Sequence, residues 1–95
     1  MAGYLIAEID ITDAEAYEEY KRIVPASVEA HCGRFLVRGG TVVPKEGGWN
    51  PKRVIVIEFP SLEAAKKFYD SSEYARALEI RLRATKSRLV LVEGA

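Results

Sequence analysis

Several strand-like runs in this sequence are apolar on both faces. Residues 52–59 read KRVIVIEF, so that Ile55 and Ile57 alternate with Val54 and Val56. Successive side chains of a strand point to opposite faces of a sheet, and helices packed on one side would bury only one of these sets. An apolar sheet face left in water usually marks an interface. The sequence therefore predicts a sheet whose second face is covered by another copy of the chain or by a ligand.

The order of elements predicts an α+β domain with the βαββαβ, ferredoxin-like topology. The predicted strands are 4–11, 34–38, 52–59 and 88–93, and the predicted helices follow Thr12 and Ser61, the second restarting at Ser72. In this topology the sheet is antiparallel and the helices share one face. A chain of 95 residues forms a single domain, 1–95.

Local patterns predict how the helices begin and where they bend. Thr12 and Glu15 have the spacing of a capping box. Pro25 lacks a backbone N–H and crowds the preceding turn, so we expect a kink or break there. In the second helical segment Tyr74, Leu78 and Leu82 are expected to point inward. Residues 41–43 could extend the second strand.

Charge and composition exclude several classes of protein. Fourteen basic and fourteen acidic residues leave no net charge to attract nucleic acid. Cys32 is the single cysteine, which excludes an internal disulfide. The N-terminus lacks the basic region of a signal peptide, and the apolar runs are shorter than the ~20 residues that span a bilayer. We expect a soluble, cytoplasmic protein with no nucleic-acid or membrane partner.

Two carboxylates are candidates for acid–base chemistry. Glu8 and Glu58 fall on the apolar second face of the two central strands. Desolvation and like charge could raise the pKa of one of them, which would suit a general acid–base pair. Alternatively, Arg34, Arg38 or Arg53 neutralises them, since buried carboxylates are usually paired.

His31 is a third acid–base candidate, because its pKa suits neutral pH. The alternative is a helix-end histidine favoured by the helix dipole. Cys32 could form a thiolate pair with His31, or could be a small, half-buried residue at a turn. One histidine and one cysteine cannot fill a zinc site, so no metal and no cofactor are predicted.

Arg34, Arg38 and Trp49 complete the candidate ligand pocket formed with His31 and Glu58. Arg34 and Arg38 fall on the same face of the 34–38 strand, where they could together clamp a carboxylate or phosphate or pair with the glutamates. Trp49 lies in a glycine-rich loop, as a lid over a pocket or as an anchor on a partner subunit.

The chain resembles the bacterial family known as domain of unknown function 1330, within the dimeric α/β-barrel superfamily. The matching segments cover nearly the whole chain: Gly33-Arg34-Phe35-Leu36, Arg38-Gly39-Gly40, Glu46-Gly47 with Trp49, Arg53, Ile57-Glu58-Phe59-Pro60-Ser61, Tyr69-Asp70-Ser71-Ser72-Glu73-Tyr74, Arg81 and Val92-Glu93-Gly94. The resemblance implies a subunit that pairs sheet to sheet as a homodimer, and implies no reaction. Cys32 stands where glycine is expected, and Ser72 where proline is common.

Two functions remain open. The first is a homodimeric α/β-barrel protein that binds a small organic ligand. The alternative is a cofactor-free enzyme with monooxygenase- or isomerase-like acid–base chemistry, as in other proteins of this superfamily. Likeness of fold alone does not decide between them.

Overall fold

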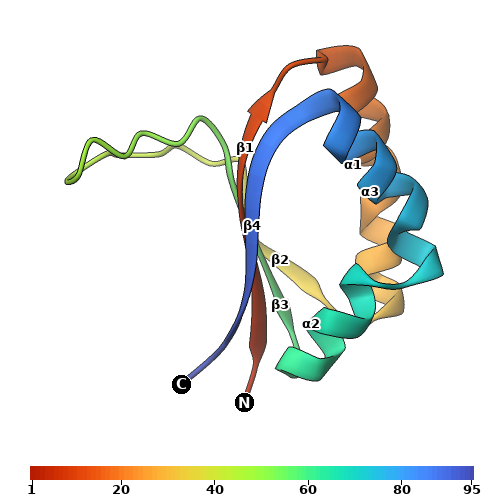
Figure 1. The fold of residues 1–95 in the computed structure, drawn as a ribbon. Coiled ribbons are helices and arrows are strands. Elements are labelled where there is room, and N and C mark those ends of the chain that lie inside the picture. The colour runs from red at the N-terminus through yellow and green to blue at the C-terminus, as the bar shows by residue number, and fades with distance from the viewer.

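The computed structural model describes all of residues 1–95 and shows the predicted ferredoxin-like topology (Figure 1). Its elements are β1 (Gly3–Ile11), α1 (Ala14–Ala30), β2 (Arg34–Arg38), β3 (Val54–Phe59), α2 (Leu62–Tyr69), α3 (Ser72–Ala84) and β4 (Thr85–Glu93). The strands form one antiparallel sheet in the order β2-β3-β1-β4. The helices lie together on one side of this sheet (Figure 1).

The helix starts follow from short polar side chains, although the cap of α1 differs from prediction. Asp13, not Thr12, caps α1 by accepting a hydrogen bond from Ala16 N at 3.1 Å. Ser61 caps α2 as predicted, and α3 begins at Ser72 as predicted, with Ser71 as its N-cap. Aspartate and serine are both strong N-cap residues, so neighbouring candidates compete for the same free N–H groups.

Helix α1 continues through Pro25, so the predicted break does not occur. Proline cannot donate to the carbonyl four residues earlier, which is that of Lys21. Arg38 Nη2 donates a hydrogen bond to this oxygen at 2.8 Å instead. The lost helical hydrogen bond is thus replaced by one from the neighbouring strand.

Helix α3 buries fewer of its predicted inward side chains than expected. Tyr74 is buried as expected, but Leu82 is 62% exposed. Two four-residue steps from Tyr74 rotate a side chain about 80° beyond two full turns. The inward stripe instead runs through Ala77, Arg81 and Ala84.

A β-bulge in β2 changes which side chains face the helices. Arg34 pairs with Glu58, but the register shifts at Leu36, so that Arg38 pairs with Ile55. A bulge places one extra residue in a strand and interrupts the alternation of its faces. Arg34 therefore lies on the open face and Arg38 on the helix-facing side, so the prediction that the two project together is wrong.

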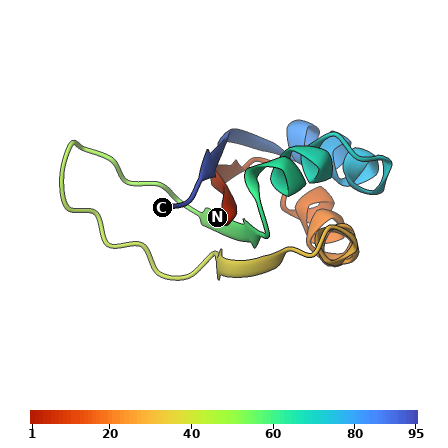
Figure 2. The ribbon, with the colours of Figure 1, turned by 90° about the horizontal axis from the view of Figure 1, so that it is seen from below.

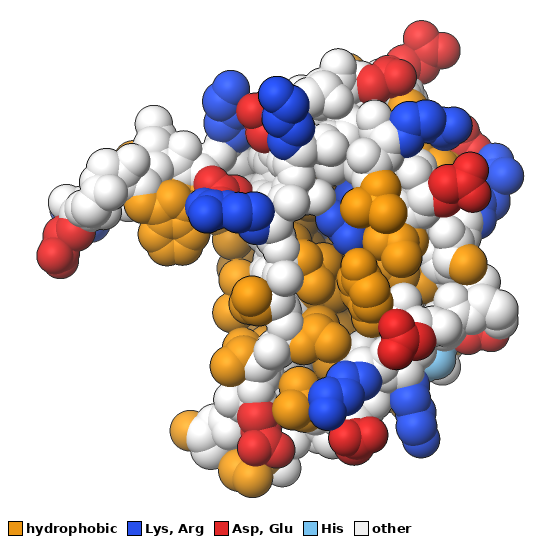
Figure 3. Space-filling view, in the orientation of Figure 1, with side chains coloured by type: hydrophobic (Ala, Val, Ile, Leu, Met, Phe, Trp, Pro, Cys, Tyr) orange, Lys and Arg blue, Asp and Glu red, His pale blue; other side chains and the backbone are white.

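The core lies between the sheet and the helices. It contains the inward side chains of the central strands and an aromatic cluster in which Phe68 contacts Phe59 and Tyr74, with ring centroids 5.0 and 4.4 Å apart. The other face of the sheet, the open face, carries apolar side chains without cover, and Figure 3 shows such side chains on both sides of the sheet. Its exposed hydrophobic residues are Ile6, Leu36, Val37, Val90 and Val92.

Residues 39–53 form an arm that leaves the sheet between β2 and β3. The arm extends away from the helices and beyond the open face (Figures 1 and 2). The strand extension predicted at residues 41–43 is absent, and Gly39 leaves β2 with a positive φ of 76°.

Candidate functional site

The structure separates the predicted site residues into three places. His31 ends α1, where its Nε2 lies 2.8 Å from Glu73 Oε1 and its ring contacts Phe68 edge-on. The hydrogen bond with His31 lowers the pKa of Glu73. Cys32 is exposed rather than half-buried. His31 therefore links α1 to α3 through a hydrogen bond and lies away from Glu8 and Glu58.

Glu58 lies on the open face and is paired. Arg34 Nε donates to its Oε1 at 2.7 Å, and Tyr4 donates to its Oε2 at 3.3 Å. The predicted neutralisation of Glu58 by Arg34 is thus present within one subunit.

Glu8 also lies on the open face but has a partner that the sequence did not suggest. Arg88 Nε donates to Glu8 Oε1 at 2.9 Å, and Trp49 Nε1 donates to Oε2 at 3.4 Å. The hydrogen bond from Arg88 lowers the pKa of Glu8, with the Trp49 bond in the same direction. Glu8 is therefore ionised at neutral pH.

The two glutamates do not form an acid–base pair within one subunit. Glu8 pairs across the strands with Val54, whereas Glu58 pairs with Tyr4. Four residues along a strand separate these positions, which is about 13 Å. Two carboxyl groups this far apart cannot share a proton directly.

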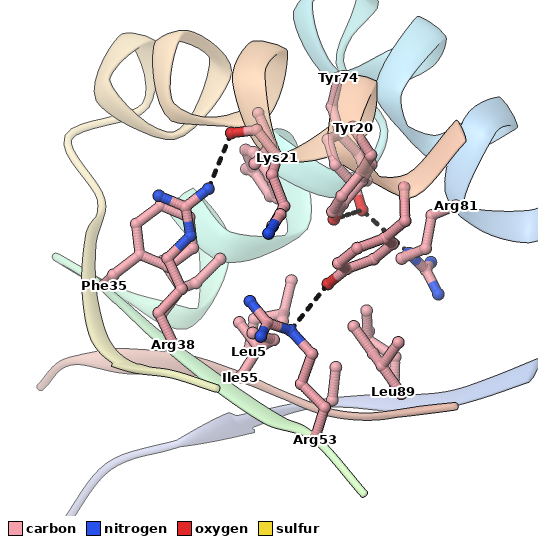
Figure 4. A pocket seen from close by; sticks show the side chains of 16 residues that line it. Leu5, Tyr20, Lys21, Phe35, Arg38, Arg53, Ile55, Tyr74, Arg81 and Leu89 are labelled. Atoms are coloured by element: carbon pink, nitrogen blue, oxygen red, sulfur yellow. Dashed lines mark hydrogen bonds between the residues drawn. The ribbon is translucent and has the colours of Figure 1, made fainter. Parts of the chain in front are cut away.

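A pocket lies on the other side of the sheet, between the strands and the helices (Figure 4). The space among its side chains is about 390 Å³ when open solvent is included, but the centre of a water molecule can occupy only about 20 Å³ of it. Twelve of its sixteen lining residues are hydrophobic, and the other four are Lys21, Arg38, Arg53 and Arg81. We call it the tyrosine–arginine pocket. Arg38 is the one predicted site residue that lines it.

Two arginines at one side of the pocket are held by neutral partners. The Arg38 guanidinium lies 4.5 Å from the centroid of the Phe35 ring, in addition to its hydrogen bond with Lys21 O. Arg53 Nε donates to Tyr17 OH at 3.1 Å. Stacking and hydroxyl contacts orient a guanidinium without cancelling its charge.

Arg81 lies at the opposite side, in a buried hydroxyl network (Figure 4). Its Nε donates to Tyr74 OH at 3.2 Å, and the Tyr74 and Tyr20 hydroxyl oxygens are 3.1 Å apart. Burial, with the adjacent Tyr74, raises the pKa of Tyr20 well above its ordinary value, so this phenol stays protonated. Burial lowers the pKa of Arg81, but Tyr74 and Tyr20 more than offset this, and the net pKa is raised.

The sequence patterns did not predict that most of these residues would line a pocket. Tyr17, Tyr20 and Tyr74 have core spacing, and nothing in a strand pattern reveals the bulge that turns Arg38 inward. One signal was present: Arg81 follows Tyr74 by seven residues, two helical turns, which places an arginine on a buried aromatic stripe.

The structure contains no group of three or more His, Cys, Asp or Glu side chains that could hold a metal ion. None of its helices has the length and apolar character needed to cross a membrane.

Solved structures similar to this chain share its fold. A protein of unknown function, RPA0582 from Rhodopseudomonas palustris, is 19% identical with a TM-score of 0.74, over 99% of this chain and 82% of its own. A dimeric ferredoxin-like protein of unknown function from Bacteroides fragilis is 14% identical with a TM-score of 0.64, over 98% and 96%. SnoaB, a cofactor-independent oxygenase from Streptomyces nogalater, is 8% identical with a TM-score of 0.61, over 99% and 93%.

No curated protein matches the chain. The family model of the domain of unknown function DUF1330 matches residues 2–95, which is nearly the whole sequence. Together with the ferredoxin-like fold, this match shows that the chain belongs to the DUF1330 family.

Proposed function

We propose that the protein binds a small organic molecule in the tyrosine–arginine pocket. The observation that carries this proposal is the lining itself, in which hydrophobic side chains surround a few oriented polar groups. Ligand sites of small molecules have this composition, and their volumes are typically ~300–1,000 Å³. In this conformation the centre of a water molecule can occupy only about 20 Å³ of the pocket, which is far below that range, so a ligand would have to be small and the lining side chains would have to move apart to admit it.

A fragment screen tests this proposal. Single-ring and short-chain compounds, neutral and charged, are added while the thermal unfolding of the protein is followed. Compounds that bind only the native state raise the melting temperature. Ala7→Leu should abolish the effect, because Ala7 lines the pocket and a larger side chain would fill it. Ala75→Leu, at an exposed position of α3, is the matched control. Binding that survives Ala7→Leu, or no binding at all, would refute the proposal.

The pocket lining does not favour the enzymatic alternative over binding. Acid–base chemistry at neutral pH usually uses histidine or a carboxylate, and the pocket lining contains neither. Its tyrosines and Lys21 would have to transfer the proton instead, and the raised pKa of Tyr20 opposes a role as base. His31, Glu8 and Glu58 lie elsewhere in the subunit.

We also propose that the protein is a homodimer, paired through the open face of the sheet as a dimeric α/β barrel. Val90 and Val92 are 58% and 43% exposed on this face. An apolar surface of this kind is stabilised when a second sheet packs against it. Two structurally similar proteins are described as dimeric with ferredoxin-like folds, which agrees with pairing.

The arm supports this arrangement. Val43 and Trp49 are 68% and 57% exposed, and the arm projects past the open face, where a second subunit would sit (Figure 2). We propose that the arm packs on the partner subunit, so that Trp49 acts as an anchor there. The candidate site residues Arg34, Trp49 and Glu58 would then belong to the dimer interface rather than to the ligand pocket.

Sedimentation with tryptophan fluorescence tests the dimer. Trp49 is the only tryptophan, so its emission reports the arm alone. Dilution of the wild-type protein should shift the emission to longer wavelength as the dimer separates. Val90→Lys should give a folded monomer with this shifted emission, and Leu82→Lys, on the helical side, should leave the dimer intact. A wild-type monomer at high concentration would contradict the proposal.

A further inference from the structure

We infer that the ligand of the tyrosine–arginine pocket is an organic anion, a carboxylate or an enolate of similar size, whose charged group is bound by Arg38 and Arg53. This inference rests on the proposed function and adds the chemical class of the ligand. The two arginines would bind the head group, and the aromatic walls would bind the apolar body.

The charge of the pocket is unbalanced. Its lining contains four cations and no aspartate or glutamate. Lys21 has a carboxylate partner, Glu18, at 2.9 Å, but no carboxylate oxygen lies within 4.0 Å of the guanidinium groups of Arg38, Arg53 or Arg81. A set of like charges without counter-ions attracts an anion.

Three of the five arginines outside the pocket are paired with a carboxylate. Arg34, Arg76 and Arg88 each form an ion pair with a glutamate, although all three are more exposed than the pocket arginines Arg53 and Arg81. The exposed Arg22 and Arg83 also form no ion pair, so the pocket is distinguished by arginines, Arg53 and Arg81, that are at least half-buried and still lack a carboxylate partner.

The strand register brings Arg38 and Arg53 together. Arg38 pairs with Ile55, and Arg53 precedes Ile55 by two residues, on the same face. Such diagonal neighbours on adjacent strands are about 7–8 Å apart at their Cα atoms. A carboxylate between the two guanidinium groups could accept hydrogen bonds from both.

Both guanidinium groups keep free donors. Arg38 uses Nη2 for Lys21 O, and Arg53 uses Nε for Tyr17 OH, so their other N–H groups have no protein acceptor. Figure 4 shows Lys21, Arg38 and Arg53 directed toward the same side of the pocket. Gly39 leaves room for Arg53, because a Cβ there would collide with Nη1 of its guanidinium group.

The rest of the lining sets the shape of the ligand. Twelve hydrophobic residues disfavour inorganic phosphate and nucleotides, whose charge would remain next to apolar walls. Arg81 is an unsuitable site for the head group, because it is only 3% exposed and already donates to Tyr74 and Ser87. The head group therefore belongs near Arg38 and Arg53, with the apolar body directed toward Tyr20 and Tyr74.

Benzoate and benzamide are suitable probes, because they have nearly the same shape and differ in charge. Each is titrated into ¹⁵N-labelled protein while the arginine Nε–H signals are followed by NMR. Benzoate should bind about ten-fold more tightly than benzamide and should shift the signals of Arg38 and Arg53. Cyclohexanecarboxylate and its amide repeat the comparison without an aromatic ring.

Arginine variants locate the charge effect. Arg38→Met and Arg53→Met keep the length of the side chain and should each weaken benzoate binding about ten-fold while leaving benzamide binding unchanged. Arg38→Lys keeps the charge without the planar fork and should weaken benzoate binding less than Arg38→Met. Arg76→Met, on the outer side of α3, is the control and should change neither benzoate binding nor benzamide binding. Unfolding curves confirm that each variant is folded.

The outcomes separate this inference from the proposed function. Equal binding of benzoate and benzamide, or a preference for benzoate that survives both methionine variants, would overturn the anionic ligand and leave small-molecule binding intact. If no charged or neutral compound binds the pocket, both fail.

Discussion

Cys32 occupies the turn after α1 in a backbone conformation that is unfavourable for a residue with a side chain. It follows the C-cap of α1 with φ of +60°, a conformation that glycine adopts without strain. Cys32 N donates to Glu29 O and Gly33 N donates to Val28 O, and these bonds close the helix end. The sequence comparison with the family already suggested glycine here, and the left-handed backbone is the physical reason.

Replacing Cys32 with glycine should stabilise the protein. A left-handed conformation costs a residue with a Cβ atom about 1 kcal/mol or more. We expect Cys32→Gly to raise the free energy of unfolding by about 1 kcal/mol, or the melting temperature by about 4–8 °C. Cys32→Ala, which keeps the Cβ, is the control and should change little. A lower stability of the glycine variant would contradict the role assigned to this turn.

The tie between His31 and Glu73 should appear in the acid stability of the protein. The pKa of Glu73 is lowered in the folded state, chiefly by the hydrogen bond with His31, relative to a usual value of 4.5. Its contribution to stability is therefore complete above that value and is lost as the pH falls through the lower folded pKa.

Glu73→Gln should reduce the loss of stability between neutral pH and a pH below 4.5, since glutamine does not titrate. Urea unfolding at the two pH values measures this difference. Glu29→Gln, an exposed glutamate of α1, is the comparison. An unchanged acid sensitivity of Glu73→Gln would show that the tie contributes nothing to it.

At the scale of elements, the bulge in β2 determines what the pocket contains. Without it, Val37 would face the helices and Arg38 would face the open side. With Leu36 as the extra residue, Phe35 and Arg38 both face inward and Val37 faces outward. Helix α1 complements this placement, because Pro25 leaves the Lys21 carbonyl free for Arg38.

Deleting Leu36 should therefore preserve the pocket. The shortened strand would pair regularly, with Arg38 still opposite Ile55. We expect a loss of stability below about 1 kcal/mol and an unchanged Arg38 Nε–H signal. Deleting Val56 from the regular strand β3 is the control. It would exchange the faces of the residues on one side of the deletion and should prevent folding. Loss of the Arg38 signal on deletion of Leu36 would contradict this interpretation.

At the scale of the whole molecule, the sheet separates two surfaces of different character. Its helix-facing side encloses a cationic, aromatic pocket, and its open side carries apolar residues with the ion pairs Arg34–Glu58 and Arg88–Glu8. The proposed dimer would cover these ion pairs. A charge pair buried in this way adds little net stability to the interface, but removing one of its partners leaves an unpaired buried charge and is strongly destabilising.

Glu58→Gln should weaken the proposed dimer. Without the carboxylate, Arg34 would be left as an unpaired charge beneath the partner subunit. We expect the dissociation constant to rise about thirty-fold, which corresponds to about 2 kcal/mol. Sedimentation over a range of concentrations measures this, and Glu73→Gln, away from the sheet, is the control. A dimer as stable as the wild type would indicate that the Arg34–Glu58 pair lies outside the interface.

The order of elements and the two apolar faces of β3 follow from the sequence alone. These properties depend on neighbouring residues: alternation within a strand, short polar side chains before a helix, and glycine at a turn. For the same reason the bounds of β2 and the first residue of α2 were predicted correctly. The start of α3 at Ser72 was also predicted correctly, and the cap of α1, Asp13 in place of Thr12, differs from prediction by only one residue.

Only the tertiary structure decided which polar side chains meet. The face of Arg38 depends on how β2 pairs with β3, and the partner of Glu8 depends on β4, eighty residues away. His31 pairs with Glu73 because α1 packs beside α3. Such contacts are set by packing between distant segments, and periodicity within one segment carries no information about them.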